Sequence, residues 1–211
     1  WIRELEELRS HLGLSQAHLL GQSWGGMLLL EYLCNHEPEG IKSIILSSTL
    51  PASWMWGQEQ MRMVRYLPQE MQDAIEKASG DYNDPAYVEA EAEYMRRHAA
   101  ETPKEDAPDC LRRPVRKGLE AYITGWGPNE FTPLGTLKDY DVTGQLRDIK
   151  APALIVSGGD DLCTPYIAKY MYDRIPESRW ELFRTCRHMC FVEENEQYIK
   201  LLKDWLNAND E

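Results

Sequence analysis

The sequence predicts an α/β protein in which a mostly parallel sheet is interrupted by a helical segment. Toward both ends of the chain, short apolar runs alternate with helical stretches, which is the pattern of a parallel sheet. Between about residues 51 and 140 the β-type runs disappear, and prolines separate several helical stretches. A chain of 211 residues is long enough for one sizeable core with a smaller subdomain attached.

The first 50 residues alternate helix and strand. Apolar residues at positions 2, 5, 8 and 12 share one face and predict an amphipathic helix that begins with the chain. The following elements are strand 17–20, helix 26–33 and strand 41–46. In folds built around a strand–turn–helix elbow, further strands normally precede that first helix, so we expect those strands to be missing from this chain.

The remaining elements define a helical insertion and a second α/β part. The clearest helices of the insertion are 61–67 and 86–98. The later elements are strand 152–156, helix 165–174, strand 179–183 and helix 196–206. The predicted division is therefore a first core part at 1–50, a helical cap at 51–140 and a second core part at 141–211. A cap of this kind typically covers an active site.

Bulk properties exclude several classes of partner. A net charge of −12 leaves no basic stripe for nucleic acid, and no apolar run is long enough to span a membrane. Five cysteines without framework spacing predict free thiols in a reducing compartment, and hence a cytoplasmic location. The pattern leaves the oligomeric state open.

The pentapeptide from Gly21 to Gly25 reads G-x-S-x-G, the spacing of a nucleophile elbow. A strand before it and a helix after it place Ser23 on a sharp turn with its hydroxyl above the sheet. We expect Gly21 and Gly25 to allow this tight turn and the close approach of helix and strand. The backbone N–H of Trp24 is the predicted oxyanion donor.

A nucleophilic serine needs a base and an orienting carboxylate, which follow in this type of fold in the order Ser, Asp, His. Asp160 and Asp161 follow strand 152–156, and His188 follows strand 179–183. We predict Asp161, rather than Asp160, as the carboxylate and His188 as the base. The other histidines are expected to be structural or at the surface: His11, His18, His36 and His98.

No metal or cofactor is predicted. Cys186, His188 and Cys190 are close in sequence, but their spacing matches no common zinc pattern. The second oxyanion donor normally comes from a loop after an earlier strand, and we expect that loop to be missing from this chain. Because one lost donor typically costs about 100- to 1000-fold in rate, the chain alone is expected to have little activity.

At these residues the chain resembles the proline iminopeptidases, which are serine peptidases of the α/β-hydrolase fold, including the archaeal aminopeptidase that works with the tricorn protease. The resemblance spans nearly the whole chain. It is carried by the elbow and its following glycine at 21–26, segments 127–132 and 135–141, segment 158–165, and the loop at His188-Met189. It implies a helical cap and removal of an N-terminal residue, often proline, from short peptides.

The resemblance also implies acidic residues that pair with the substrate ammonium, and Glu130 matches one of them. A glutamate that the tricorn-associated branch places directly after the catalytic aspartate is Leu162 in this chain. Three other carboxylates are candidates to compensate: Asp160, Glu193 and Glu194. Four aromatic residues are candidates to line an apolar pocket, the alternative for each being ordinary packing within the helical segment: Trp54, Trp56, Tyr122 and Trp126. Trp126 is the preferred pocket residue.

The leading prediction is a cofactor-free serine aminopeptidase that acts on short peptides through an acyl-enzyme. Leu162 favours an alternative, an amino-acid amidase or esterase of the same fold. The missing oxyanion loop favours a third hypothesis, an inactive scaffold that binds ligands or partners.

Overall fold

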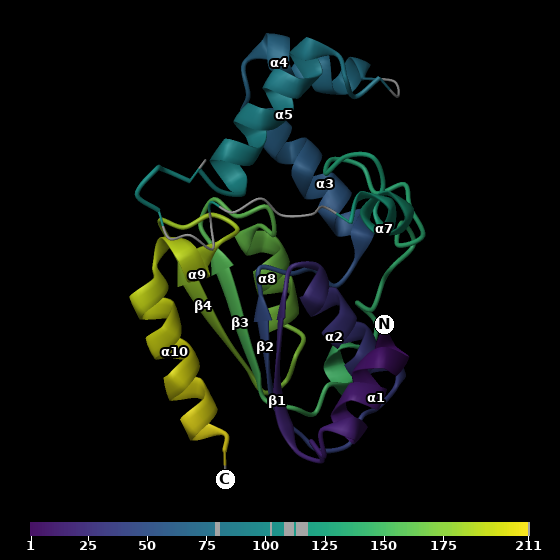
Figure 1. Ribbon diagram of the computed structural model, residues 1–211, viewed down its shortest axis with the longest axis vertical. Helices are drawn as coiled ribbons and strands as arrows, with labels where there is room; N and C mark the ends of the chain where they lie inside the picture. Colours follow the sequence, from purple (N-terminus) through teal and green to yellow (C-terminus); the bar gives the residue numbers. More distant parts are fainter. Residues whose placement is uncertain (79–80, 102, 108–111, 113–117, 211) are drawn as a thin grey trace.

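The computed structural model describes residues 1–78, 81–101, 103–107, 112 and 118–210 (Figure 1). In this part of the chain, four strands form one parallel sheet in the order β1-β2-β3-β4. The strands are β1 (Ala17–Gln22), β2 (Ile41–Ser47), β3 (Ala153–Gly158) and β4 (Ser178–Phe183). The parallel α/β architecture predicted from the sequence is confirmed.

The two central strands, β2 and β3, are apolar on both faces because helices cover the sheet on both sides. Buried apolar side chains form two hydrophobic clusters, a larger one on one face of the sheet and a smaller one on the other. Ile44 and Leu46 belong to the larger cluster, while Ile45 between them belongs to the smaller one. In β3, Ile155 likewise joins the larger cluster and Leu154 the smaller. This alternation with period two fixes the register of the sheet.

Helices from both ends of the sequence form the two outer layers. They are α1 (Ile2–His11), α2 (Trp24–Asn35), α8 (Pro165–Tyr172), α9 (Cys190–Glu193) and α10 (Asn195–Ala208), with a 3-10 turn, η1, at Leu146–Asp148. Helices α2 and α8 bury side chains in the larger cluster, whereas α10 packs on the smaller one from the opposite face (Figure 1).

In the described part of residues 51–140, four helices, which we call the upper helices, lie above the carboxyl ends of the strands (Figure 1). They are α3 (Ser53–Val64), α4 (Gln69–Lys77), α5 (Pro85–His98) and α7 (Leu119–Gly125). The helix predicted over 61–67 has the wrong bounds, since α3 begins eight residues earlier and ends at Val64. After Val64 the helical pattern gives way to tighter turns, because Tyr66 N and Leu67 N donate to the carbonyls three residues back. Pro68 also disfavours a helical conformation for Leu67.

The chain leaves and rejoins the sheet layer at one place, because Ala52 and Asp141 form an isolated antiparallel bridge. The upper helices are also tied to the loop after β3. Gln60 of α3 donates from Nε2 to the Leu162 carbonyl at 2.9 Å, and His98 of α5 donates from Nδ1 to the Asp160 carbonyl at 2.9 Å. Side chains at the carboxyl edge of the sheet therefore lie beneath a helical layer. Within the described residues, no helix combines the length and apolarity needed to cross a membrane.

Candidate active site

Ser23 lies on a strained turn between β1 and α2. Its backbone has φ 54° and ψ −122°, a conformation that residues with a side chain rarely adopt. The turn is held in place because Ser23 N donates to the Ser47 carbonyl at 3.0 Å. Because Trp24 is the first residue of α2, its N–H has no carbonyl within that helix to bind.

Two glycines let α2 start close to the sheet, and one of them is not the one expected. A Cβ on Gly21 would lie 2.4 Å from the Gly25 carbonyl oxygen, and a Cβ on Gly26 would lie 2.4 Å from Thr49 Cβ. A Cβ on Gly25 would meet nothing within 4 Å. The expectation for Gly21 agrees with the structure, but the role expected of Gly25 belongs to Gly26.

Asp161 is completely buried and accepts four hydrogen bonds. One comes from His188 Nδ1 at 2.8 Å, so this ring nitrogen carries the proton that it donates to the carboxylate. The other donors are Ser48 Oγ at 2.6 Å, Gly158 N at 3.1 Å and Cys163 N at 2.8 Å. The structure therefore brings Asp161 and His188 together, whereas Asp160 is exposed and its carbonyl accepts from His98.

Ser23 and His188 are placed at the same edge of the sheet by β1 and β4. In the described part of the chain, no hydrogen bond joins Ser23 Oγ to the imidazole. Bonds of this kind are often long in a site without substrate and shorten when substrate binds.

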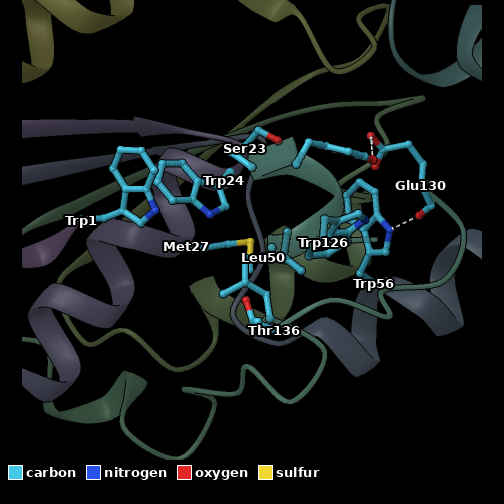
Figure 2. Close-up of a pocket in the computed structure, with 13 residues that line it drawn as sticks. Trp1, Ser23, Trp24, Met27, Leu50, Trp56, Trp126, Glu130 and Thr136 are labelled. Atoms are coloured by element: carbon cyan, nitrogen blue, oxygen red, sulfur yellow. Dashed lines mark hydrogen bonds between the residues drawn. The ribbon is translucent and has the colours of Figure 1, made fainter. Parts of the chain in front are cut away.

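Ser23 lines a cavity of about 400 Å³ beneath the upper helices. Ser23 and Trp24 lie on one side of it, and Glu130, Trp56 and Trp126 lie on the other (Figure 2). The rings of Trp56 and Trp126 meet edge to face with centroids 5.5 Å apart. The other lining residues are Trp1, Met27, Leu50, Ala121, Tyr122, Gly125, Thr136 and Leu137. The cavity is thus largely apolar, with few polar groups.

Glu130 is the carboxylate in this cavity among the described lining residues. Its Oε1 accepts a hydrogen bond from the Tyr122 hydroxyl at 2.7 Å, and its carbonyl accepts one from Trp56 Nε1 at 2.6 Å. Burial raises the pKa of the Glu130 carboxyl above its usual range, against the opposing effects of the Tyr122 hydroxyl and of His188 nearby. A cation in the cavity would replace the solvation that Glu130 has lost.

The three carboxylates proposed to compensate for Leu162 do not line this cavity. Glu193 binds Arg187 through Oε1 at 2.6 Å, and Glu194 accepts from the Thr185 hydroxyl at 3.2 Å. Asp160 lines a separate polar cleft between α5 and the loops after β3 and β4.

Leu162 itself is buried in the larger hydrophobic cluster, as its apolar side chain favours. Trp54 is also outside the cavity: it is 44% exposed, and its Nε1 donates to Asp141. The expectation that Trp54 lines the pocket is therefore wrong. Trp56, Tyr122 and Trp126 do line it.

Asp161, Cys163 and His188 have potential metal-ligand atoms within 4.8 Å of one another. Hydrogen bonds account for this proximity, because Asp161 binds the imidazole and Cys163 Sγ donates to the Ser48 carbonyl at 3.0 Å. Burial raises the pKa of the Cys163 thiol, which disfavours the thiolate that a metal would need. Among the described residues, Cys186 and Cys190 do not join His188 in such a cluster.

Comparisons with known proteins agree with this geometry. A family model described as the alpha/beta hydrolase fold matches residues 2–195. The proline iminopeptidase of Clostridium botulinum is 61% identical over 212 residues, and that of Clostridioides difficile is 56% identical over 212 residues. Each match covers 100% of this chain and 72% of the relative. The crystal structure of proline iminopeptidase from Mycobacterium smegmatis has a TM-score of 0.87 and 31% identity, covering 99% of this chain and 71% of that one.

The parallel sheet, the elbow and the buried Asp161–His188 pair define an α/β hydrolase. Within that fold, the chain belongs to the proline iminopeptidase family. The fold and the family predicted from the sequence are both confirmed. The assignment to the tricorn-associated branch stays a prediction.

One residue in contact with Asp161 was missed in the sequence. Ser48 directly follows β2, so it lies at the same carboxyl edge as the other candidate residues. Its place after a buried strand was a usable signal. Its left-handed backbone, with φ 47°, leaves no mark in the sequence.

Proposed function

We propose that the protein is a serine aminopeptidase that removes an N-terminal proline, or another small apolar residue, from short peptides. The observation that carries the proposal is that Ser23 and the carboxylate of Glu130 share one aromatic-walled cavity. A free N-terminus is a cation, and a carboxylate largely withdrawn from water favours binding a cation over a neutral acylated amine. High identity to proteins named proline iminopeptidase supports the same activity.

In the proposed reaction, Ser23 Oγ attacks the carbonyl carbon of the first residue while His188 Nε2 takes the hydroxyl proton. Asp161 holds the imidazole through Nδ1, and the Trp24 N–H stabilises the oxyanion. The peptide nitrogen then leaves with the proton from His188. Water attacks the acyl-enzyme by the same route and releases the N-terminal amino acid.

In this proposal the N-terminal residue sits between Glu130 and the aromatic wall. Glu130 binds its ammonium, and Trp126 with Trp56 packs against its side chain. We further propose that residues 51–140 act as a cap over the site, which the bridge between Ala52 and Asp141 supports. A cytoplasmic location belongs to the same proposal, supported by the free thiols of Cys34, Cys163, Cys186 and Cys190.

The test compares hydrolysis of a prolyl arylamide with that of its N-acetylated counterpart, using the chain with any residues that precede Trp1 in the natural protein. Cleavage of the free amine alone is the expected result. Equal cleavage of both would instead support an amidase or esterase, the alternative that the buried Leu162 favours. A fluorophosphonate probe tests for an inactive scaffold, because only an activated serine reacts, and Ser23→Ala should abolish labelling.

A further inference from the structure

The three residues that end β2 and begin the next loop, Ser47 to Thr49, are all buried at the carboxyl edge of the sheet. Ser48 has φ 47°, in the left-handed region that favours glycine or asparagine over serine. Its backbone N–H donates to the Val156 carbonyl at 2.8 Å, so β3 holds this conformation. Strained backbone that a neighbouring strand holds in place is often found at functional sites, so the role of the Ser48 side chain is of interest.

The left-handed turn directs the Ser48 side chain to Asp161. Ser48 Oγ donates to Asp161 Oδ2 at 2.6 Å, while His188 Nδ1 donates to the other oxygen, Oδ1, at 2.8 Å. The Ser48 carbonyl accepts from Cys163 Sγ at 3.0 Å, and Cys163 N in turn donates to Asp161 Oδ1 at 2.8 Å. Ser48 and His188 therefore donate to different oxygens of the Asp161 carboxylate. The bond from the Ser48 hydroxyl restricts rotation of this carboxylate.

The same segment also holds the nucleophile elbow. Ser47 accepts from Ser23 N through its carbonyl at 3.0 Å, and Thr49 Oγ1 donates to the Ser23 carbonyl at 2.7 Å. Three consecutive residues thus bind the backbone of Ser23 and the side chain of Asp161. They set the position of both ends of the Ser23, His188, Asp161 array.

We propose that Ser48 is a positioning residue that orients Asp161 toward His188 and offsets part of the negative charge that Asp161 presents to the imidazole. This rests on the proposed function, because it assigns His188 the role of base for Ser23. The hydroxyl acts through Asp161 and does not touch substrate.

Ser48→Gly is the informative variant. It deletes the hydroxyl, and glycine adopts the left-handed backbone without strain, so the turn is retained. Ser48→Ala deletes the same hydroxyl but keeps the strain, and it serves as the second variant. The readout is the rate at which a fluorophosphonate labels Ser23 as a function of pH, measured on the full natural chain. Labelling needs an activated serine but no particular peptide substrate.

We expect Ser48→Gly to lower the plateau labelling rate by about tenfold, because a charged acceptor loses a hydrogen bond. The labelling rate falls at low pH, and we expect the pH at which it reaches half of its plateau, the midpoint, to move upward by about half a pH unit. The reason is that Asp161 then presents more negative charge to His188. Loss of folded protein alone would lower the plateau without moving this midpoint.

Other titratable groups near the Asp161–His188 pair are the same in all variants, so they do not produce the shift. They are Glu130, His98, Cys163 and Cys190, together with the chain neighbours Asp160 and Arg187. Ser43→Ala is the matched control. Ser43 is a buried serine at the other end of β2, and its hydroxyl binds His18 and Trp205. We expect it to leave the midpoint unchanged.

An unchanged midpoint in both Ser48 variants would overturn the proposal, as would an equal shift in Ser43→Ala. A wild-type chain that the probe does not label would overturn this proposal and the proposed function together. A wild-type chain that is labelled but does not cleave prolyl arylamides would overturn only the aminopeptidase assignment.

Discussion

At the scale of single residues, Glu130 is a carboxylate set against an apolar wall. Its burial there raises the pKa of the Glu130 carboxyl above its usual range. Such a group is costly to keep ionised unless a cation arrives, and a substrate ammonium is that cation in the proposed reaction. Specificity for a free N-terminus then follows from one residue, with Tyr122 fixing its orientation.

Replacing Glu130 with glutamine should raise KM for a prolyl arylamide steeply and lower kcat/KM by about 100-fold, because a hydrogen bond to a charged group is lost. The wild type should also show a KM that rises as pH falls. Since the pKa of Glu130 is raised, the carboxylate takes up a proton at a higher pH than an ordinary glutamate does, and only the ionised form binds the ammonium. Steady-state kinetics from pH 8 to 5 measures both effects.

Glu120→Gln is the matched control, since Glu120 is an exposed residue of α7 outside the cavity. It should behave as wild type. In Glu130→Gln the acid-side rise in KM should disappear. A KM that still rises in Glu130→Gln as in the wild type would remove Glu130 from the substrate site.

At the scale of elements, the start of α2 depends on how closely it approaches β2. Gly26→Ala would place a Cβ 2.4 Å from Thr49 Cβ, and Thr49 holds the Ser23 carbonyl. We expect a loss of about 1–3 kcal/mol in the free energy of unfolding, with a loss of labelling at Ser23. Gly25→Ala should instead be neutral or stabilise by up to about 1 kcal/mol, since its Cβ meets nothing and alanine favours a helix.

Urea denaturation and fluorophosphonate labelling of the two alanine variants measure this difference. A Gly25→Ala variant as damaged as Gly26→Ala would show that the elbow, rather than the contact with Thr49, is what excludes a side chain. The pair is matched in residue type and differs in position by one residue.

Elements were predictable where periodicity alone decides them. Strand β2 and helix α5 were located within a residue or two, because buried strands and amphipathic helices leave a repeating pattern. The start of α3 was missed because its early residues mix serine, tryptophan and glycine without a clear apolar stripe.

In the site, Ser23, Asp161 and His188 could be predicted because each follows a predicted strand. Of these three, the structure joins Asp161 and His188 by a hydrogen bond. The place of Glu130 came from the resemblance to a family, since a glutamate in a loop has no pattern of its own. The roles of Gly26 and Ser48 depend on distances between α2, β2 and β3. Such tertiary distances are not encoded in local sequence, so reading the chain element by element misses them.

At the scale of the whole molecule, one junction between the proposed cap and the sheet layer lies at the last residue of α5. His98 donates from Nδ1 to the Asp160 carbonyl, and its own carbonyl accepts from His188 N at 3.1 Å. Arg187 reinforces the junction by donating to the Arg96 carbonyl at 2.8 Å. The end of one upper helix therefore contacts the loops that carry both Asp161 and His188, so movement of this helix is coupled to the geometry of the site.

The junction should weaken in mild acid. Burial lowers the pKa of His98, so the neutral ring stabilises the fold above the ordinary histidine pKa of about 6.5, and this contribution is lost as pH falls through the lowered value. His98→Asn keeps an N–H donor but removes the titration. We expect its free energy of unfolding to fall less than that of the wild type between pH 7.5 and 5.

Urea denaturation across that pH range measures, for the wild type and for His98→Asn, the slope of the free energy of unfolding against pH. His11→Asn is the control, because it replaces an exposed histidine at the end of α1, and its slope should equal that of the wild type. Equal slopes for His98→Asn and the wild type would show that other groups control acid stability. If the slopes differ as expected, the labelling rate of Ser23 should decline over the same pH interval more in the wild type than in His98→Asn. The helix end and the His188 loop share hydrogen bonds, so loosening one must disturb the other.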